Sequence, residues 1–218
     1  MTTFASILPT VLSVLSLCLS VFTLWMTQLR RGKLKMTQPT LVCLKREQPS
    51  GRYKLFVRTL LYATAIKGCG VELMFAQVTT NYGSYLFDFW GHTESGKLTL
   101  GSGLFVGQTG VTADHHFNPR RDAMEFLFVD GPYHIELFAR IVGIKKPIKL
   151  QEVEFTLDGL QAGSLIQILD TELFLYWNPE TGGYESELRR GDRTFHTRPP
   201  DFPSWFNLNG GEAEKAEL

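Results

Sequence analysis

The sequence predicts an all-β protein, an antiparallel β-sandwich of Ig-like or related type, preceded by one N-terminal transmembrane α-helix. Three observations predict this fold class. The first 29 residues contain no Asp, Glu, Lys or Arg. Beyond residue 36, short runs rich in aromatic and β-branched residues alternate with Gly, Pro, Asn or Ser, as in strands and turns. A spacing of about 10–14 residues per strand favours the sandwich over the alternative, a closed β-barrel.

The membrane helix is predicted from the apolar run Ile7–Met26. About 20 residues at about 1.5 Å each span the roughly 30 Å hydrocarbon core of a bilayer. A cleaved signal sequence fits less well, because residues 1–4 carry no basic side chain and no small-residue cleavage pattern follows. Since Lys and Arg are enriched in cytoplasmic flanks, we expect the N-terminus outside and the large domain in the cytoplasm. The four basic residues at the membrane surface are Arg30, Arg31, Lys33 and Lys35.

One face of this helix carries small hydroxyl side chains. They repeat at spacings of 3, 4 and 7 residues and are Ser6, Ser13, Ser16, Ser20, Thr23 and Thr27. Small residues let two helices approach closely, so the stripe predicts self-association or docking on a membrane protein partner. In the alternative interpretation, each hydroxyl bonds back to a carbonyl of its own helix.

The predicted strands follow one another along the rest of the chain. Alternation is clearest in Tyr133–Ile141, where one face is apolar and His134, Glu136 and Arg140 face the other way. Asn178-Pro179 and Gly182-Gly183 predict the turn of a hairpin. The expected strands cover residues 40–45, 54–63, 71–79, 85–90, 97–106, 125–129, 133–142, 150–157, 165–168, 173–177 and 184–188, with a short helix at 164–170 as an alternative to the strand there.

Four segments organise the chain in this interpretation. Residues 1–29 form the transmembrane anchor, 30–39 a basic linker, 40–197 the cytoplasmic β-sandwich, and 198–218 a Pro-rich and then flexible tail. The 22 Lys and Arg residues balance 22 Asp and Glu residues, so we expect no nucleic-acid partner. The three cysteines are an odd number without a close pair, which argues against a disulfide framework.

The strongest polar cluster is the segment Asp114–Asp122, which we interpret as a loop. Its candidate ligand-binding residues are His115, His116, Arg120 and Arg121, a set suited to a small anionic ligand such as a nucleotide. Neighbouring histidines point apart in an extended chain, and no further His or Cys stands at ligand spacing. We therefore expect no metal site.

The sequence contains no recognised catalytic signature. Gly91–Lys97 matches part of a phosphate-binding loop, but Leu98 stands where a hydroxyl would hold Mg²⁺, so we expect no cofactor. We expect a non-enzymatic, membrane-anchored binding module for a cytoplasmic protein or ligand, self-associating through its helix and touching membrane lipid. Two alternatives stay open: an effector that senses a small anionic molecule, and a hydrolase that uses Ser102 beside Asp114–His116.

Overall fold

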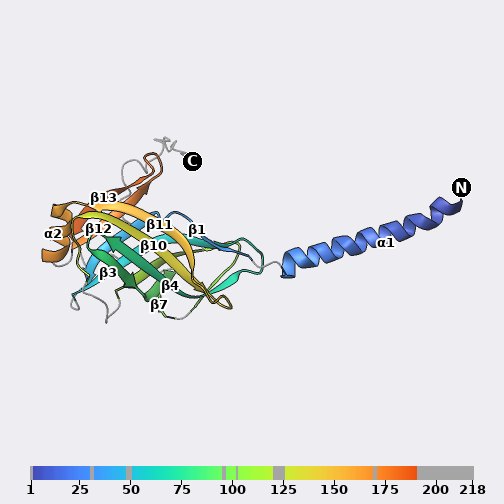
Figure 1. Ribbon diagram of the computed structural model, residues 1–218, viewed down its shortest axis with the longest axis horizontal. Helices are drawn as coiled ribbons and strands as arrows, with labels where there is room; N and C mark the ends of the chain where they lie inside the picture. Colours follow the sequence, from blue (N-terminus) through green and yellow to red (C-terminus); the bar gives the residue numbers. More distant parts are fainter. Residues whose placement is uncertain are drawn as a thin grey trace, which may run out of the picture.

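The computed structural model describes residues 2–29, 32–47, 51–94, 97–101, 103–119, 126–168 and 171–190. The N-terminal helix α1 (Thr2–Leu24) continues into a π-helical turn η1 (Trp25–Leu29) and projects from one end of a β-rich body (Figure 1). Within it, Pro9–Thr27 is a stretch of 19 residues that is long and apolar enough to cross a membrane, and none of it is buried against the rest of the protein.

Thirteen strands and one further helix are described in the body. They are β1 (Leu34–Met36), β2 (Leu41–Glu47), β3 (Arg52–Ala63), β4 (Cys69–Thr80), β5 (Gly83–Phe87), β6 (Phe89–Glu94), β7 (Lys97–Leu100), β8 (Leu104–Val106), β9 (Val111–Asn118), β10 (Gly131–Ile141), β11 (Ile148–Leu157), α2 (Gly159–Gln167), β12 (Thr171–Asn178) and β13 (Gly183–Arg190).

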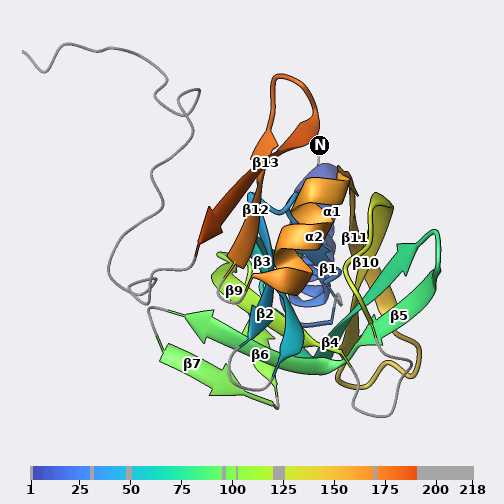
Figure 2. The ribbon, with the colours of Figure 1, turned by 90° about the vertical axis from the view of Figure 1, so that its left-hand side faces the viewer.

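The strands form two antiparallel sheets that face each other. The large sheet has the order β13-β12-β2-β3-β9-β6-β7, with β1 paired to β3. The small sheet has the order β11-β10-β4-β5, with β8 paired to β4. Neither sheet closes on itself and no described strand pair joins them, so the fold is the predicted open sandwich and not a barrel. Figure 2 looks at the end opposite α1, where α2 lies across the sandwich.

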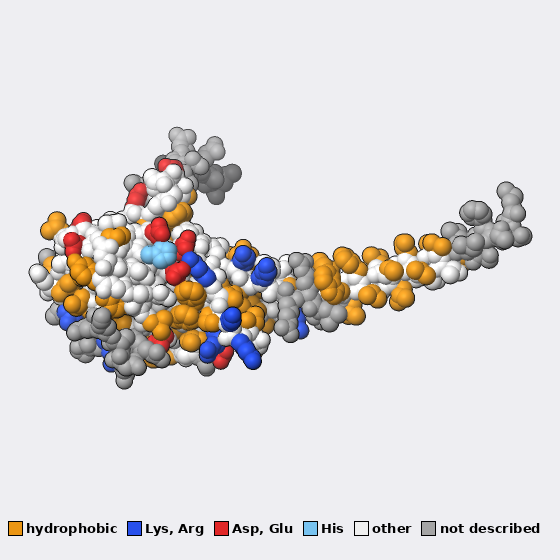
Figure 3. All heavy atoms as spheres, in the orientation of Figure 1, with side chains coloured by type: hydrophobic (Ala, Val, Ile, Leu, Met, Phe, Trp, Pro, Cys, Tyr) orange, Lys and Arg blue, Asp and Glu red, His pale blue; other side chains and the backbone are white. Residues whose placement is uncertain are grey.

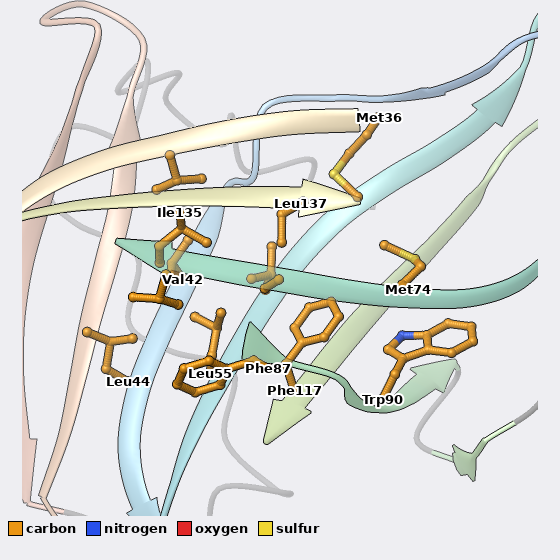
Figure 4. Packing of buried hydrophobic residues seen from close by; sticks show 14 of the residues in the cluster. Met36, Val42, Leu44, Leu55, Met74, Phe87, Trp90, Phe117, Ile135 and Leu137 are labelled. Atoms are coloured by element: carbon orange, nitrogen blue, oxygen red, sulfur yellow. The ribbon is translucent and has the colours of Figure 1, made fainter. Parts of the chain in front are cut away.

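The core lies between the sheets. Tyr133, Ile135 and Leu137 of β10 point inward, as the alternation of that strand predicts, and they are almost fully buried. Val42 and Leu55 of the large sheet enter the same cluster (Figure 4). Each fully buried aliphatic side chain contributes about 1.5–3 kcal/mol relative to an exposed one, so this layer is the main source of stability.

A second apolar cluster lies on the outer face of the large sheet. It consists of Leu41, Cys43, Phe56, Phe174 and Tyr176. Because side chains alternate across a strand, the unbroken apolar run of β12 fills the core from one face and this cluster from the other. Burial raises the pKa of the Cys43 thiol, so it stays protonated and packs as an apolar group.

The segment predicted to be a polar loop is mostly a strand, which corrects that interpretation. Residues 111–118 form β9, in the middle of the large sheet between β3 and β6. Its inward positions are Ala113, His115 and Phe117, all buried. The alternation is therefore present in the sequence, but it is hidden because a neutral histidine takes a core position that we counted as polar.

The strand expected at 125–129 is also wrong in its described part. Residues 126–129 join no ladder, although Phe126 and Phe128 are buried and contact Tyr53 edge to face. The Tyr133 hydroxyl takes the place of a partner strand, because it accepts a hydrogen bond from Val129 N (2.8 Å) and donates one to Val129 O (2.9 Å). Glu125 lies outside the described residues.

Residues 165–168 are not the expected strand, because 159–167 form α2. Asp158 and Gln161 form a capping box: the Asp158 carboxylate accepts a hydrogen bond from Gln161 N (2.8 Å), and the Gln161 side chain accepts one from Asp158 N (3.2 Å). The helix then buries Leu165 in the core. The alternative of a helix at 164–170 came nearer, but it missed the start because the capping signal precedes it.

Three strand boundaries also differ from the expectations. The expected strand at 85–90 lies in two strands, β5 and β6, interrupted at Asp88. The one at 97–106 is broken between β7 and β8, where Gly101 and Gly103 adopt positive φ. β1 lies inside the segment interpreted as a linker, and its Leu34 and Met36 reach the core, so the sandwich begins there. The expected tail at 198–218 lies outside the described residues.

The junction between α1 and the body is short and tightly packed. A Cβ at Gly32 would stand 2.7 Å from Ala65 N, so no larger residue fits without a shift of backbone. Lys33 N donates to Thr64 Oγ1 (2.8 Å), and Thr64 N donates to Lys33 O (3.0 Å). The chain therefore enters the sandwich along the turn between β3 and β4.

Candidate functional site

The structure places His115 and His116, the two described residues of the predicted ligand site, on opposite faces of β9. His115 is 0% exposed and lies opposite His92 in the ladder between β9 and β6, with Trp90 close by. His116 points to the other face, where its Nε2 lies 2.9 Å from Thr93 Oγ1. The prediction that these two histidines point apart is confirmed. Arg120 and Arg121 lie outside the described residues.

His115 is held as a neutral core side chain. Its Nδ1 accepts a hydrogen bond from the Trp90 indole Nε1 (3.3 Å), so the ring proton of the neutral form belongs on Nε2. Burial, with smaller contributions from His92 and His116, lowers the pKa of His115 to about 3. The ring therefore carries no charge near neutral pH and offers no accessible group to a soluble anion.

Asp114 is used within the sheet. Its carboxylate faces Arg58 across the β3–β9 ladder and accepts two hydrogen bonds, from Nε (2.6 Å) and from Nη2 (3.1 Å). A bidentate pair of this kind fixes both side chains in one geometry. Ser102, the nucleophile of the hydrolase alternative, lies outside the described residues.

The hydroxyl stripe of α1 bonds mainly to its own helix. Ser13, Ser20, Thr23 and Thr27 each donate to the carbonyl four residues earlier, at 2.8–2.9 Å. This is the alternative interpretation of the stripe, and it leaves the small residues on an exposed helix face. The side chain of Ser6 lies outside the described residues, as do Arg30 and Arg31 of the basic flank. Lys33 and Lys35 are exposed.

A different polar cluster lies on the outer face of the small sheet. It combines His134 and Glu136 of β10 with Lys149, Glu152 and Glu154 of β11, and forms the patch of pale blue, red and blue in Figure 3. His134 lies opposite Glu154, and Glu136 lies opposite Glu152. His134 Nδ1 is 2.8 Å from Glu154 Oε1. Antiparallel pairing thus brings two polar residues of β10 beside three charged residues of β11.

Lys149 occupies the centre of this cluster. Its Nζ donates to Glu136 Oε1 and to Glu152 Oε2, both at 2.6 Å. These hydrogen bonds lower the pKa of both carboxyls and raise the pKa of the ammonium. Donor atoms of His134, Glu136 and Glu152 lie within 4.8 Å of one another, close enough to contact one metal ion. Such an ion would first have to displace Lys149, which already forms ion pairs with both acids.

A shallow hollow of about 510 Å³ adjoins the cluster. Polar side chains line it from β4 and its turn (Thr79, Thr80 and Asn81), and aromatic ones line it from β10 and β11 (Tyr133 and Phe155). The two rings stack with centroids 5.2 Å apart. Burial raises the pKa of Tyr133 to about 12, so this hydroxyl is neutral and serves its backbone contacts. His134 and Glu154 belong both to the lining of the hollow and to the charged cluster, and we call the hollow and the cluster together the β10–β11 surface.

Sequence reasoning placed His134 and Glu136 on the polar face of residues 133–141 but assigned no site to them. The cluster could have been predicted from a hairpin between 133–142 and 150–157, because the register of that hairpin puts His134 beside Glu154. Register depends on the bulge between Leu137 and Phe138, and that bulge is not apparent in the sequence.

No protein-family model and no characterised protein sequence matches this chain. Among solved structures, partial likeness is found to a family 123 glycoside hydrolase from Clostridium perfringens, with a TM-score of 0.35 and 10% identity over 60% of this chain. The chain spans 28% of that hydrolase. Another is the CooA pilin subunit from enterotoxigenic Escherichia coli, with a TM-score of 0.31 and 10% identity over 57% of this chain and 98% of the pilin. At these TM-scores neither likeness bears on function.

Proposed function

We propose that this protein is a single-pass membrane protein that presents its β-sandwich in the cytoplasm as a non-enzymatic binding module. The observation that carries the proposal is α1: its apolar stretch Pro9–Thr27 has no contact partner in the described fold and no charged residue. Exposing Leu, Val and Phe side chains along a whole helix to water costs free energy, whereas placing them in lipid is favourable. A lipid bilayer would provide the apolar environment for α1 that the sandwich does not provide.

The orientation is supported by charge and by the cysteines. Basic residues follow α1 directly, whereas residues 1–29 carry no charged side chain. Cys18, Cys43 and Cys69 are all free thiols. Free thiols fit a reducing compartment, which agrees with a cytoplasmic sandwich.

Binding is assigned to the β10–β11 surface. It combines a hollow with three carboxylates, one lysine and one histidine. Its excess of carboxylates fits a partner that offers basic side chains, because opposite charges bring such partners together. The anion sensor and the hydrolase lack this support among the described residues, because His115 is buried, His116 points to the opposite face of β9, and the Asp114 carboxylate is paired with Arg58.

Anchoring and orientation are tested in intact cells and isolated membranes. We expect the full chain to stay in the membrane after alkaline carbonate washing. We also expect protease to digest the sandwich only after the membrane is opened. Release by carbonate would contradict the anchor, and digestion in intact cells would reverse the orientation.

Self-association through the hydroxyl stripe is the second part of the proposal. We expect the full chain in detergent to sediment as an oligomer, and Ser16→Leu to weaken that oligomer because leucine separates the helix backbones. Val14→Leu, on a different face of α1, is the matched control and should have no effect. A strict monomer in wild-type protein would remove this part and leave the anchor intact.

The binding surface is tested with a basic probe, oligolysine, titrated against the full chain in detergent. Glu154→Gln should weaken binding because it removes an exposed carboxylate of the surface. Glu180→Gln, in the turn between β12 and β13, makes the same change elsewhere and should not. Equal binding by both variants would mean that oligolysine attaches by general charge attraction, which would contradict the assignment.

A further inference from the structure

The end of the sandwich from which α1 projects carries exposed apolar side chains. Ile66 lies in the β3–β4 turn, Val142 in the β10–β11 turn, and Phe105 on β8; they are 66%, 67% and 68% exposed. Phe105 is paired with Gly70, whose O accepts a hydrogen bond from Val142 N (3.0 Å). Phe105 and Val142 therefore flank a glycine that adds no side chain between them. We call these two turns, 64–68 and 142–147, together with Phe105, the proximal surface.

Lysines surround these apolar groups. Lys67 belongs to the first turn, and Lys145 and Lys146 belong to the second; all three are exposed, and neither turn contains a carboxylate. Lys33 and Lys35 lie beside them where the chain enters the sandwich. No described carboxylate forms an ion pair with any of these five ammonium groups. Figure 3 shows blue and orange side chains side by side at this end of the body.

The length of the chain keeps the proximal surface close to any bilayer that α1 crosses. The apolar stretch ends at Thr27, and Gly32 already packs against Ala65 in the first turn. Five residues span at most about 18 Å even when fully extended. The headgroup region outside the hydrocarbon core is roughly 5–8 Å deep on each side. The turn thus has little room to stand away from the membrane surface.

From these observations we propose that the proximal surface lies against an anionic bilayer, with Ile66, Phe105 and Val142 at the level of the headgroups and Lys67, Lys145 and Lys146 against lipid phosphates. The inference rests on the proposed anchoring by α1. Apolar side chains ringed by lysine suit this boundary, because the rings and aliphatic groups leave water while the ammonium groups stay at the charged layer. The sandwich is then held in a fixed pose on the membrane.

The test measures how near the proximal surface comes to lipid in the full chain reconstituted into vesicles. A fluorophore is attached to Ile66→Cys or, as a matched control, to Tyr82→Cys, in a background carrying Cys18→Ala and Cys69→Ser. Tyr82 is also 66% exposed but lies in the β4–β5 turn at the other end of β4. We expect headgroup-labelled lipids to quench position 66 and not position 82, and more strongly when phosphatidylglycerol is added to phosphatidylcholine. Equal quenching at the two positions would overturn the proposal.

Charge variants separate docking from anchoring. Lys145→Glu should shift the docking equilibrium by more than the roughly fivefold expected for loss of one lysine at an anionic surface, because it also adds a repelling charge. Lys54→Glu, at the far end of β3, is the matched control and should leave quenching unchanged. Unchanged quenching in Lys145→Glu would contradict the lysine contacts. Protein that carbonate releases from the vesicles would instead refute the anchor, so the two failures are distinguishable.

Discussion

His115 and His134 are both on central positions of antiparallel strands, yet their surroundings are opposite. His115 is enclosed between the sheets, accepts a hydrogen bond from Trp90 and is kept neutral by burial. His134 is part of the outer face of the small sheet and lies within 4.0 Å of three carboxylates. The same side chain serves as core packing in one sheet and as part of a charged surface in the other. The face of the strand to which it points decides between these two uses.

The largest expected effect comes from removing the buried His115 side chain. We expect His115→Ala to lower the free energy of unfolding by about 3 kcal/mol, because it leaves a cavity and removes the acceptor of the Trp90 indole. Urea titration of the full chain in detergent measures the change. His115→Gln retains an acceptor and should cost less. A loss below about 1 kcal/mol in His115→Ala would mean that the site is not closely packed.

Because His115 is buried as a neutral ring, lowering the pH should destabilise the folded protein. The pKa of His115 is about 3 in the folded state against an ordinary value of 6.5, so between these values only the unfolded state binds the proton. The free energy of unfolding therefore falls as the pH falls, by about 2 kcal/mol between pH 6.5 and pH 5. Because His92 and His116 lie beside His115, the wild-type slope is compared with that of His115→Gln, which should be flatter. Identical slopes would contradict the burial of His115 as a neutral ring.

The half-buried His134 should tolerate the same truncation. We expect His134→Ala to change the free energy of unfolding by no more than about 0.5 kcal/mol, because its contacts are partly solvated. The urea titration used for His115→Ala gives the number. A cost similar to that of His115→Ala would show that the outer cluster is structural and would erase the contrast between the two sites.

The smallest effect is expected inside the outer cluster itself. Lys149→Met should raise the pKa of Glu136 toward its ordinary value, because the hydrogen bond from Lys149 is the largest cause of its lowering. The carboxyl shift followed by NMR across an acid titration measures it. His134 remains beside Glu136 in this variant, so part of the lowering should persist. No change on losing Lys149 would mean that the ion pair does not form in solution.

Several elements of this fold can be predicted from short sequence patterns. The alternation of Tyr133–Ile141 predicted β10 because one face meets the core and the other meets solvent. The Asn-Pro and Gly-Gly pairs predicted the β12–β13 hairpin, and the uncharged N-terminus predicted α1. Each of these patterns determines the structure of its own segment, so these elements could be predicted without knowing which distant residues they contact.

The misses share a cause, which is that a distant partner decided the outcome. β9 was taken for a loop because its histidines look polar until Trp90 and the core enclose them. Residues 126–129 look like a strand, but Tyr133 takes the place of a neighbour. The outer cluster needed the register of two strands. Within the expected ligand site, the two described histidines lie on opposite faces because side chains alternate along β9.

The tight junction at Gly32 also determines how mechanical load passes through the molecule. Tension or torque on α1 reaches Lys33 first, and its backbone is tied to Thr64 by two hydrogen bonds. Thr64 starts the turn that joins β3 of the large sheet to β4 of the small sheet. A pull is therefore shared by both layers at their common corner, and neither layer is peeled away from the other.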